Sequence, residues 1–404
     1  MTSVALLVPP FQGHVNPALG TAAALVRGGH RVAIHLPEDF RVAVEGVGAK
    51  LWPYDPQPPP DWAAVDDDRL VRFASLPARL AHESRTVLPI VLAALAAHPP
   101  DVLAYDQLCV WGHLAAAVTK LPAALLCTSY AAGPGWSPWD HQAYAALPPV
   151  PVADAAWTAS MDEMAERHGA PRMSLPDLFG AVEPVNVVFM PRVLQPAGAT
   201  FDDRYVFVGP ALRPATGNAS CIGDTGEDLP LVYVSMGTMF GDWPQLSALC
   251  DLAFADGRWR VLVADPGSEQ VDRGPVAVRR SVDQLAVLDR AAVAVSHGGM
   301  GSVLEALNAG VPLVVVPQVP EQEITADRVA ALGVGVRLDR ATMDSEVLRR
   351  AVDEVADDPR IRRAVDRMRY AVQAPGGASA AASALLRRAE TSTSDAGSSA
   401  TPLL

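Results

Sequence analysis

Two series of short apolar runs dominate this sequence, and a segment with helical spacing follows most of the runs. The first series comprises 4–10, VALLVPP, 31–36, RVAIHL, 101–106, DVLAYD, 122–129, PAALLCTS, 185–190 and 205–210. The second comprises 231–238, LVYVSMGT, 259–265, 276–280, 291–297 and 313–317. Such runs are typical of buried parallel strands joined by crossover helices. The pattern therefore predicts an α/β protein with two doubly wound sheets.

The segment after the first run has the start and stop signals of a helix. Asn16 can cap the helix, Pro17 suits its first turn, and Gly28 and Gly29 can end it. Apolar residues between them recur at helical spacing, namely Leu19, Ala22, Ala23 and Val26. The loop that contains FQGHV is thus expected to join the first strand to this helix, as in a βαβ unit.

A polar, turn-rich stretch at 213–229 separates the two series and is the best linker candidate. We therefore expect an N-terminal Rossmann-like domain at 1–212 and a C-terminal one at 230–388, which suits a chain of 404 residues. Residues 131–180 lack clear periodicity and are interpreted as loops and short helices over one face of the first domain. The Ser/Thr-rich tail at 389–404 is expected to be disordered.

Charge and cysteine content narrow the class of protein. The formal net charge is −13, the opposite of what a nucleic-acid-binding protein requires. No two of the four cysteines have metal-ligand or CxxC spacing; they are Cys109, Cys127, Cys221 and Cys250. The N-terminus lacks the basic region of a signal peptide, and no apolar run has the length of a membrane span. A soluble cytoplasmic protein is expected, and a homodimer is among the assemblies that remain open.

Residues 296–302, SHGGMGS, lie between an apolar run and a helical segment that Gly310 ends. A helix N-terminus carries a partial positive charge of roughly +0.5 and binds phosphates through its free N–H groups. Glycine lets an oxyanion approach the backbone closely. His297 and Ser302 can donate to phosphate oxygens, and Glu305 can accept from ribose hydroxyls. The turn, with Gly298, Gly299 and Gly301, is therefore a candidate phosphate site, although glycine-rich turns also occur without a ligand.

The wider spacing resembles the donor-site motif of the nucleotide-sugar-dependent glycosyltransferases of family 1. The matching positions, in order, are Gln284, His297, Gly299, Ser302, Glu305, Gly310, Val311, Pro312, Pro317, Glu321 and Gln322. Weaker matches at GHVNP, YVFVGP and SMGT extend the resemblance over nearly the whole chain, and the bacterial natural-product branch is the most similar. The resemblance implies the GT-B fold, in which two Rossmann-like domains face each other across a cleft.

The resemblance also implies roles for individual residues of the second domain. Gly237 and Thr238 would contact the donor's diphosphate, Val282 main-chain atoms the base, and Glu321 and Gln322 the sugar. Ser281 stands where the family usually has a base-stacking tryptophan, and Asp283 replaces the usual proline. Aromatic stacking on the base is therefore lost, and the preference between uracil and thymine stays open.

His14, in the GHVNP segment, matches the general base of the family. An imidazole, with a pKa of about 6.5, suits removal of a proton from a sugar-acceptor hydroxyl. Asp106 ends the run DVLAYD and matches the partner aspartate, which would fix the tautomer and stabilise the cation. Five residues are candidates for an apolar acceptor pocket, although each can simply pack: Phe11, Trp136, Trp139, His141 and Tyr144.

The sequence thus predicts an inverting, metal-independent O-glycosyltransferase without a cofactor. Its substrates would be a UDP- or dTDP-linked hexose or deoxyhexose and a small apolar natural product such as a polyketide. Asp66–Asp68 has an Asp-x-Asp pattern, which is interpreted as a solvated run or a helix cap rather than a metal site. Two alternatives remain: an NAD(P)-dependent oxidoreductase with two Rossmann domains, although FQGHVNP lacks GxGxxG, and a catalytically silent homologue that acts as a partner protein.

Overall fold

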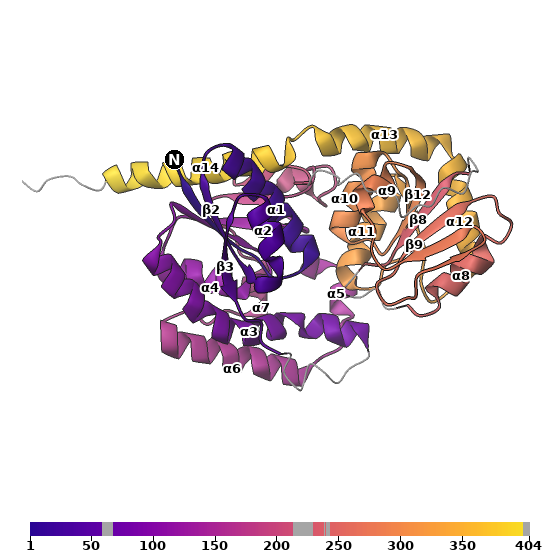
Figure 1. Cartoon of the computed structure of the whole chain (residues 1–404). Coiled ribbons are helices and arrows are strands. Elements are labelled where there is room, and N and C mark those ends of the chain that lie inside the picture. Colours follow the sequence, from indigo (N-terminus) through magenta and orange to yellow (C-terminus); the bar gives the residue numbers. More distant parts are fainter. Residues whose placement is uncertain (59–67, 213–228, 238, 240–242, 399–404) are drawn as a thin grey trace, which may run out of the picture. The chain divides into compact units, whose positions relative to one another are not determined.

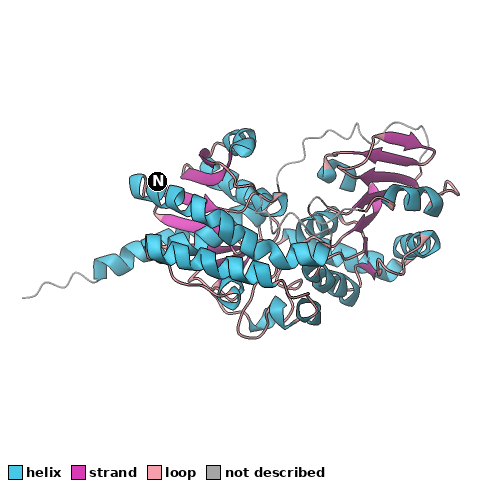
Figure 2. Cartoon of the chain, turned by 90° about the horizontal axis from the view of Figure 1, so that it is seen from below, coloured by secondary structure: helices cyan, strands magenta, loops and turns pink. Residues whose placement is uncertain are grey.

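The computed structural model describes residues 1–58, 68–212, 229–237, 239 and 243–398, with the backbone alone from 392. The chain divides into two compact α/β units. The first unit comprises Met1–Asp140, Ala146–Arg213 and Pro375–Leu404, and the second comprises His141–Ala145 and Pro214–Ala374. Figure 1 shows the elements of both units, and Figure 2 shows helices flanking the strands of each unit.

The first unit contains a seven-stranded sheet in the order β3-β2-β1-β4-β5-β6-β7, and every neighbouring pair is parallel. The strands are β1 (Ser3–Leu7), β2 (Arg31–Pro37), β3 (Lys50–Tyr54), β4 (Val102–Asp106), β5 (Ala123–Cys127), β6 (Asn186–Val188) and β7 (Tyr205–Phe207). The helices are α1 (Gln12–Arg27), α2 (Arg41–Gly46), α3 (Arg69–Ala97), α4 (Val110–Thr119), α6 (Pro151–His168), α7 (Leu175–Phe179) and α14 (Gly377–Ser398). The strand order reverses between β1 and β4, which is where doubly wound sheets bind ligands.

The second unit contains a seven-stranded sheet in the order β10-β11-β9-β8-β12-β13-β14, in which only the β10–β11 pair is antiparallel. The strands are β8 (Leu231–Ser235), β9 (Arg260–Ala264), β10 (Val271–Arg273), β11 (Val276–Arg279), β12 (Ala291–Ser296), β13 (Leu313–Val315) and β14 (Gly335–Arg337). The helices are α5 (Gln142–Ala145), α8 (Leu246–Ala253), α9 (Gln284–Leu288), α10 (Met300–Ala309), α11 (Pro320–Ala331), α12 (Ser345–Asp357) and α13 (Pro359–Gln373). In this sheet the strand order reverses between β8 and β12. Two parallel α/β sheets are the fold class that the sequence predicted.

The C-terminal helix belongs to the first unit, which corrects the expected boundary at 388 and the expected disorder from 389. α14 contacts α1, β4 and β5 (Figure 1). Leu385 is fully buried in the core beside α1, and burying a leucine contributes about 2 kcal/mol. The amide of Gly377 donates to the carbonyl of Val208 (2.7 Å), and Arg388 Nε donates to the carbonyl of Ala123 (3.1 Å). Residues 399–404 lie outside the described chain.

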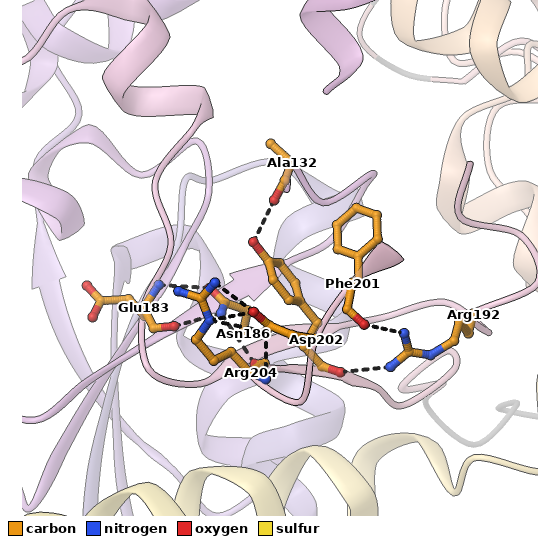
Figure 3. A network of polar contacts seen from close by, with 8 residues as sticks. Ala132, Glu183, Asn186, Arg192, Phe201, Asp202 and Arg204 are labelled. Atoms are coloured by element: carbon orange, nitrogen blue, oxygen red, sulfur yellow. Dashed lines mark hydrogen bonds and ion pairs between the residues drawn. The ribbon is translucent and has the colours of Figure 1, made fainter. Parts of the chain in front are cut away.

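A polar network fixes the chain between β6 and β7. Arg192 donates to the carbonyls of Gly198 (2.8 Å) and Phe201 (2.9 Å), and Asn186 donates to that of Glu183 (2.7 Å). Figure 3 shows the bonds to Phe201 and Glu183. The hydroxyl of Tyr205 donates to the carbonyl of Ala132 (2.8 Å). This last bond ties the irregular segment after β5 to the sheet, so the segment has a defined path.

The segment 131–180 is more helical than the sequence suggested, because it contains the 18-residue helix α6. Its buried residues recur at helical spacing against α3, but they include small and polar types, namely Ala153, Trp157, Ser160, Met161 and Met164. α3 is, by length and composition alone, long and apolar enough to cross a membrane, and among the described residues it is the one helix of that kind. It packs against α4 and α6.

Candidate active site

His14 lies in the first turn of α1 rather than in the loop that the sequence suggested. α1 begins at Gln12 with Phe11 as its N-cap, so Pro17 lies inside the helix and Asn16 is not the cap. The amide of His14 donates to the carbonyl of Phe11 (2.8 Å). The imidazole is 16% exposed and Phe11 contacts its edge at a centroid distance of 5.9 Å. The helical backbone therefore holds the imidazole at the carboxyl end of β1.

Asp106 ends β4, the strand next to β1, and its side chain is fully buried. His14 Nδ1 lies 2.9 Å from Asp106 Oδ2, while Asp106 Oδ1 accepts from the amide of Leu108 (2.8 Å). The two sequence-predicted residues therefore meet as a histidine–carboxylate pair. Such a pair leaves Nε2 of the imidazole to accept a proton.

Thr128 is a third member of this group that sequence reasoning missed. It follows β5 and is buried, and its hydroxyl lies 2.8 Å from His14 Nδ1 and 2.9 Å from Asp106 Oδ2. Since β5 neighbours β4, their carboxyl ends lie side by side. The run PAALLCTS predicted this strand, and the threonine directly after it is the signal that could have pointed to the site.

Four side chains with buried polar atoms form a second group in the first unit, where β2, β3, α3 and α4 meet. The rings of His35, Tyr54 and Trp111 contact one another in sequence at 6.4 and 5.9 Å. Both ring nitrogens of His35, the hydroxyl of Tyr54, Nε1 of Trp111 and Oε1 of Glu83 have no hydrogen-bond partner among the described residues. Burial lowers the pKa of His35 to about 4. Burial also raises the pKa of Glu83 to about 7, although the nearby charge of Arg79 lowers it.

Glu83→Gln is expected to raise the melting temperature more at pH 8 than at pH 5. Because the pKa of Glu83 is raised in the fold, stability is lost as pH rises from about 4.5 towards 7, and the loss at pH 8 is at most about 3 kcal/mol. Glutamine removes the buried charge. Differential scanning fluorimetry at both pH values measures the effect, with Glu166→Gln in α6 as the control. Equal changes in melting temperature at pH 5 and pH 8 would contradict a raised pKa of Glu83.

The turn between β12 and α10 in the second unit encloses the ring of His297. Gly237, after β8, and Gly298 have positive φ angles of 80° and 87°. A Cβ at Gly237 would lie 2.7 Å from the His297 ring, and one at Gly299 would lie 2.4 Å from Nε2. The imidazole therefore packs between the backbone at Gly237 and the backbone at Gly299, and only glycine fits at either position. β8 and β12 flank the reversal of the strand order, where a ligand is expected.

The chemistry of His297 fits an anionic ligand that is held by neutral donors. Burial lowers the pKa of His297 to about 4, so the ring is uncharged at pH 7 and donates from one nitrogen. Its Nδ1 is buried with no hydrogen-bond partner among the described residues. Gly299 is the N-cap of α10, so the free amides of the first turn, which includes Gly301 and Ser302, lie beside this ring.

Three predicted donor residues form one hydrogen-bond network. Gln284 Nε2 donates to Glu305 Oε2 (2.5 Å) and lies 3.4 Å from Ser302 Oγ. The hydroxyl of Tyr233, on β8, donates to Gln284 Oε1 (2.8 Å), a contact that the sequence did not predict. Asp283 caps α9 by accepting from the amide of Ala286 (3.3 Å), which gives this departure from the family pattern a structural role. Val282 directly precedes this cap.

Glu321 and Gln322 occupy the first turn of α11. Gln322 is buried, and its Oε1 accepts from the amide of Gln318 (2.8 Å). The side-chain oxygen of Gln318 accepts a hydrogen bond from Arg340. The guanidinium carbon of Arg340 lies 4.6 Å from the centre of the Trp243 ring. Thr238 lies outside the described residues.

The five acceptor candidates are divided between the two units. Phe11, Trp136 and Trp139 belong to the first unit, whereas His141 and Tyr144 belong to the second. The rings of Trp136 and Trp139 contact Tyr130 at 5.6 Å and Phe179 at 4.4 Å. His141 Nε2 lies 3.5 Å from Asp327 Oδ2, on α11. The ring of Phe11 contacts that of His14, as described above.

Asp68, the last residue of the Asp-x-Asp pattern, caps α3 by accepting from the amide of Leu70 (2.8 Å). Asp66 and Asp67 lie outside the described residues. Over the described part of the chain, no group of three or more histidine, cysteine or acidic residues could hold a metal ion. The helix-cap interpretation of Asp68 is thus confirmed.

Comparisons with known proteins agree with this arrangement. Residues 252–382 match the family described as "Erythromycin biosynthesis protein CIII-like, C-terminal domain". The chain is 35% identical to NDP-glycosyltransferase YjiC of Bacillus subtilis (strain 168), over 94% of this chain and 95% of that protein. It is 34% identical to demethyllactenocin mycarosyltransferase of Streptomyces fradiae, over 95% of this chain and 85% of that protein.

Among solved structures, the glycotransferase of kitacinnamycin superposes with a TM-score of 0.79 at 28% identity, over 96% of this chain and 98% of that one. The glycosyltransferase CalG4 of calicheamicin superposes with a TM-score of 0.76 at 27% identity, over 99% and 100%. These neighbours establish the GT-B fold that the sequence predicted. With relatives of this identity along nearly its whole length, the chain belongs to the family 1 glycosyltransferases, in the branch of natural-product biosynthesis.

Proposed function

We propose that this glycosyltransferase moves a hexose or deoxyhexose from a UDP- or dTDP-sugar to a hydroxyl of a small apolar natural product, with inversion at the anomeric carbon. The observation that carries the proposal is the contact of 2.9 Å between His14 Nδ1 and Asp106 Oδ2. Relatives named demethyllactenocin mycarosyltransferase and oleandomycin glycosyltransferase support an acceptor of polyketide type. A cytoplasmic location is part of the same proposal.

His14 acts as the general base in this mechanism. Its Nδ1–H donates to Asp106, and its Nε2 accepts the proton of the acceptor hydroxyl as the oxygen attacks C1 of the sugar. The new C1–O bond forms as the bond from C1 to the diphosphate breaks, and the diphosphate leaves with the electron pair. A single displacement of this kind inverts the configuration. The imidazolium that results is stabilised by the Asp106 carboxylate until it loses the proton to water.

The second unit would hold the departing diphosphate without a metal or cofactor. The amides at the start of α10 and the neutral ring of His297 are donors that are fixed before the reaction, and such donors are worth about 3–4 kcal/mol each in transition states. Gln284 and Glu305 would hold the nucleoside, with Val282 main-chain atoms at the base. Glu321 and Gln322, in the first turn of α11, would contact the sugar.

The two alternatives are less well supported. The turn after β1 contains FQGHVNP in place of GxGxxG, which an NAD(P)-dependent oxidoreductase would require. A catalytically inactive homologue would not require the buried carboxylate of Asp106 beside His14.

A thermal-shift panel of UDP, dTDP, GDP and NAD tests the donor site. UDP or dTDP at about 100 times its Kd is expected to stabilise the protein by about 2.7 kcal/mol, and NAD is expected to have no effect. The shift is expected to persist in EDTA, because amides and neutral side chains bind the diphosphate. Stabilisation by NAD alone would overturn the nucleoside-diphosphate donor. A thermal shift with UDP or dTDP that EDTA removes would overturn binding without a metal.

A further inference from the structure

The hydroxyl of Thr128 completes a triangle with the two residues of the base. Its Oγ1 lies 2.8 Å from His14 Nδ1 and 2.9 Å from Asp106 Oδ2, and those two atoms are themselves 2.9 Å apart. Thr128 and Asp106 are both buried, so little water competes for these bonds. Other threonine hydroxyls of this unit have a local role, since Thr21 and Thr119 each donate to the carbonyl four residues earlier.

The protons available to the triangle select one arrangement. A carboxylate only accepts hydrogen bonds, so Asp106 Oδ2 needs protons from both of its neighbours. The single proton of the Thr128 hydroxyl is then donated to Asp106, which leaves its oxygen as an acceptor facing His14. Nδ1 of His14 faces two acceptors, and it satisfies them only when it carries the hydrogen. The other tautomer would place the Nδ1 lone pair against the carboxylate and would put the hydrogen on Nε2.

We propose that Thr128 is a positioning residue that keeps His14 in the Nδ1–H tautomer, so that Nε2 carries no hydrogen and can accept a proton. The inference rests on the proposed role of His14 as the base. Thr128 fixes the carboxylate of Asp106 from the β5 side, while the amide of Leu108 fixes its other oxygen at 2.8 Å. The two bonds hold the carboxylate in the plane where it meets Nδ1. Thr128, one residue after β5, thus affects the reaction through its contacts with Asp106 and the base His14.

The first test compares Thr128→Val, which has the same shape without the hydroxyl, with Thr128→Ser, which keeps the hydroxyl. Thr128→Val is expected to lower kcat by about 10–100-fold, the cost of one hydrogen bond to a charged group, with KM for donor and acceptor within about 2-fold of the parent. Thr128→Ser is expected to stay within about 3-fold of the parent kcat. Thr119→Val, which removes a half-buried hydroxyl in α4, controls for the loss of a hydroxyl elsewhere in the same unit.

A second measurement separates positioning from a general effect on the fold. In the Asp106→Asn background, Thr128→Val is expected to lower kcat by less than about 2-fold further, because residues of one network do not contribute additively. Nitrogen-15 shifts of the neutral His14 ring are expected to report the Nδ1–H tautomer in the parent and in Thr128→Ser, and a mixture of tautomers in Thr128→Val. If Thr128→Val does not fold, Thr128→Ala takes its place.

The outcomes distinguish this inference from the function on which it rests. An active His14→Ala variant would remove the base, and the role of Thr128 would fall with it. An inactive His14→Ala variant together with an unchanged Thr128→Val would overturn the role of Thr128 alone. Equal losses of kcat in the valine and serine variants, or the same loss with and without Asp106, would also overturn it.

Discussion

His14→Ala is expected to lower kcat by about 10³-fold while nucleotide binding is retained. A positioned general base contributes about 10²–10⁴-fold, and a small-molecule hydroxyl attacks poorly without one. Nucleotide binding should persist, because the proposed donor residues lie in the other unit, on α9, α10 and α11. Initial rates with a UDP- or dTDP-sugar and a phenolic or macrolide acceptor measure the loss, and the thermal shift with the nucleoside diphosphate measures binding.

His168→Ala is the matched control for this substitution. His168 ends α6 in the same unit, and none of the site contacts described above involves it. Its removal is expected to leave kcat within about 2-fold. If His14→Ala retained the parent rate, the general base would have to be another group, and Asp106 would then be only a buried partner of a structural histidine.

The fold was predictable where strands are central and buried. The runs around β1, β4, β8 and β12 are continuous and apolar because helices cover both faces of the sheet. The three strands that the pattern did not predict, β3, β10 and β14, each lie at the edge of a sheet. Edge strands are short and mixed in composition, and β3 even contains Pro53, which an edge tolerates because one side of the backbone is unpaired.

The helix boundaries were less predictable, and the start of α1 shows why. Asn16 and Pro17 form a good start signal, with Asn16 as the cap and Pro17 as the first helical residue. α1 begins five residues earlier, at Gln12, because Gly13 and His14 can take helical geometry before the proline. Pro17 is the sixth residue of α1, beyond the first turn, so the helix lacks the bond that an amide at this position would donate to the carbonyl of Gly13. The membership of α14 could not be predicted either, because it depends on contacts with residues about 350 positions earlier.

Most of the candidate site could be predicted because its residues follow strands. His14 and Asp106 were predicted from the family resemblance, and His297 from its place in a glycine-rich turn after an apolar run. The structure brings His14 to Asp106 and His297 to the glycines. Thr128 and Tyr233 were not predicted, because each is one polar residue at a strand and has no motif of its own. Their significance comes only from the side chains that the neighbouring strands place beside them.

Gly299→Ala is expected to weaken binding of the nucleoside diphosphate by about 10–100-fold or more. The new Cβ would lie 2.4 Å from Nε2 of His297, and the ring cannot withdraw because Gly237 packs against it. The imidazole must therefore leave its position at the start of α10, and the ligand loses one fixed donor and the alignment of the helix amides. Isothermal titration with UDP and dTDP measures the change in affinity.

Gly301→Ala, two residues further on, separates this clash from a general effect on the helix. A Cβ at Gly301 would meet no atom within 4 Å, and alanine inside a helix is more stable than glycine by about 0.5–1 kcal/mol. The free protein is therefore expected to melt at the same or a higher temperature. A loss of nucleotide affinity in this variant would then come from contact with the ligand, because the protein itself has no reason to rearrange. If Gly299→Ala bound nucleotide as tightly as the parent, the turn around His297 would not be the diphosphate site.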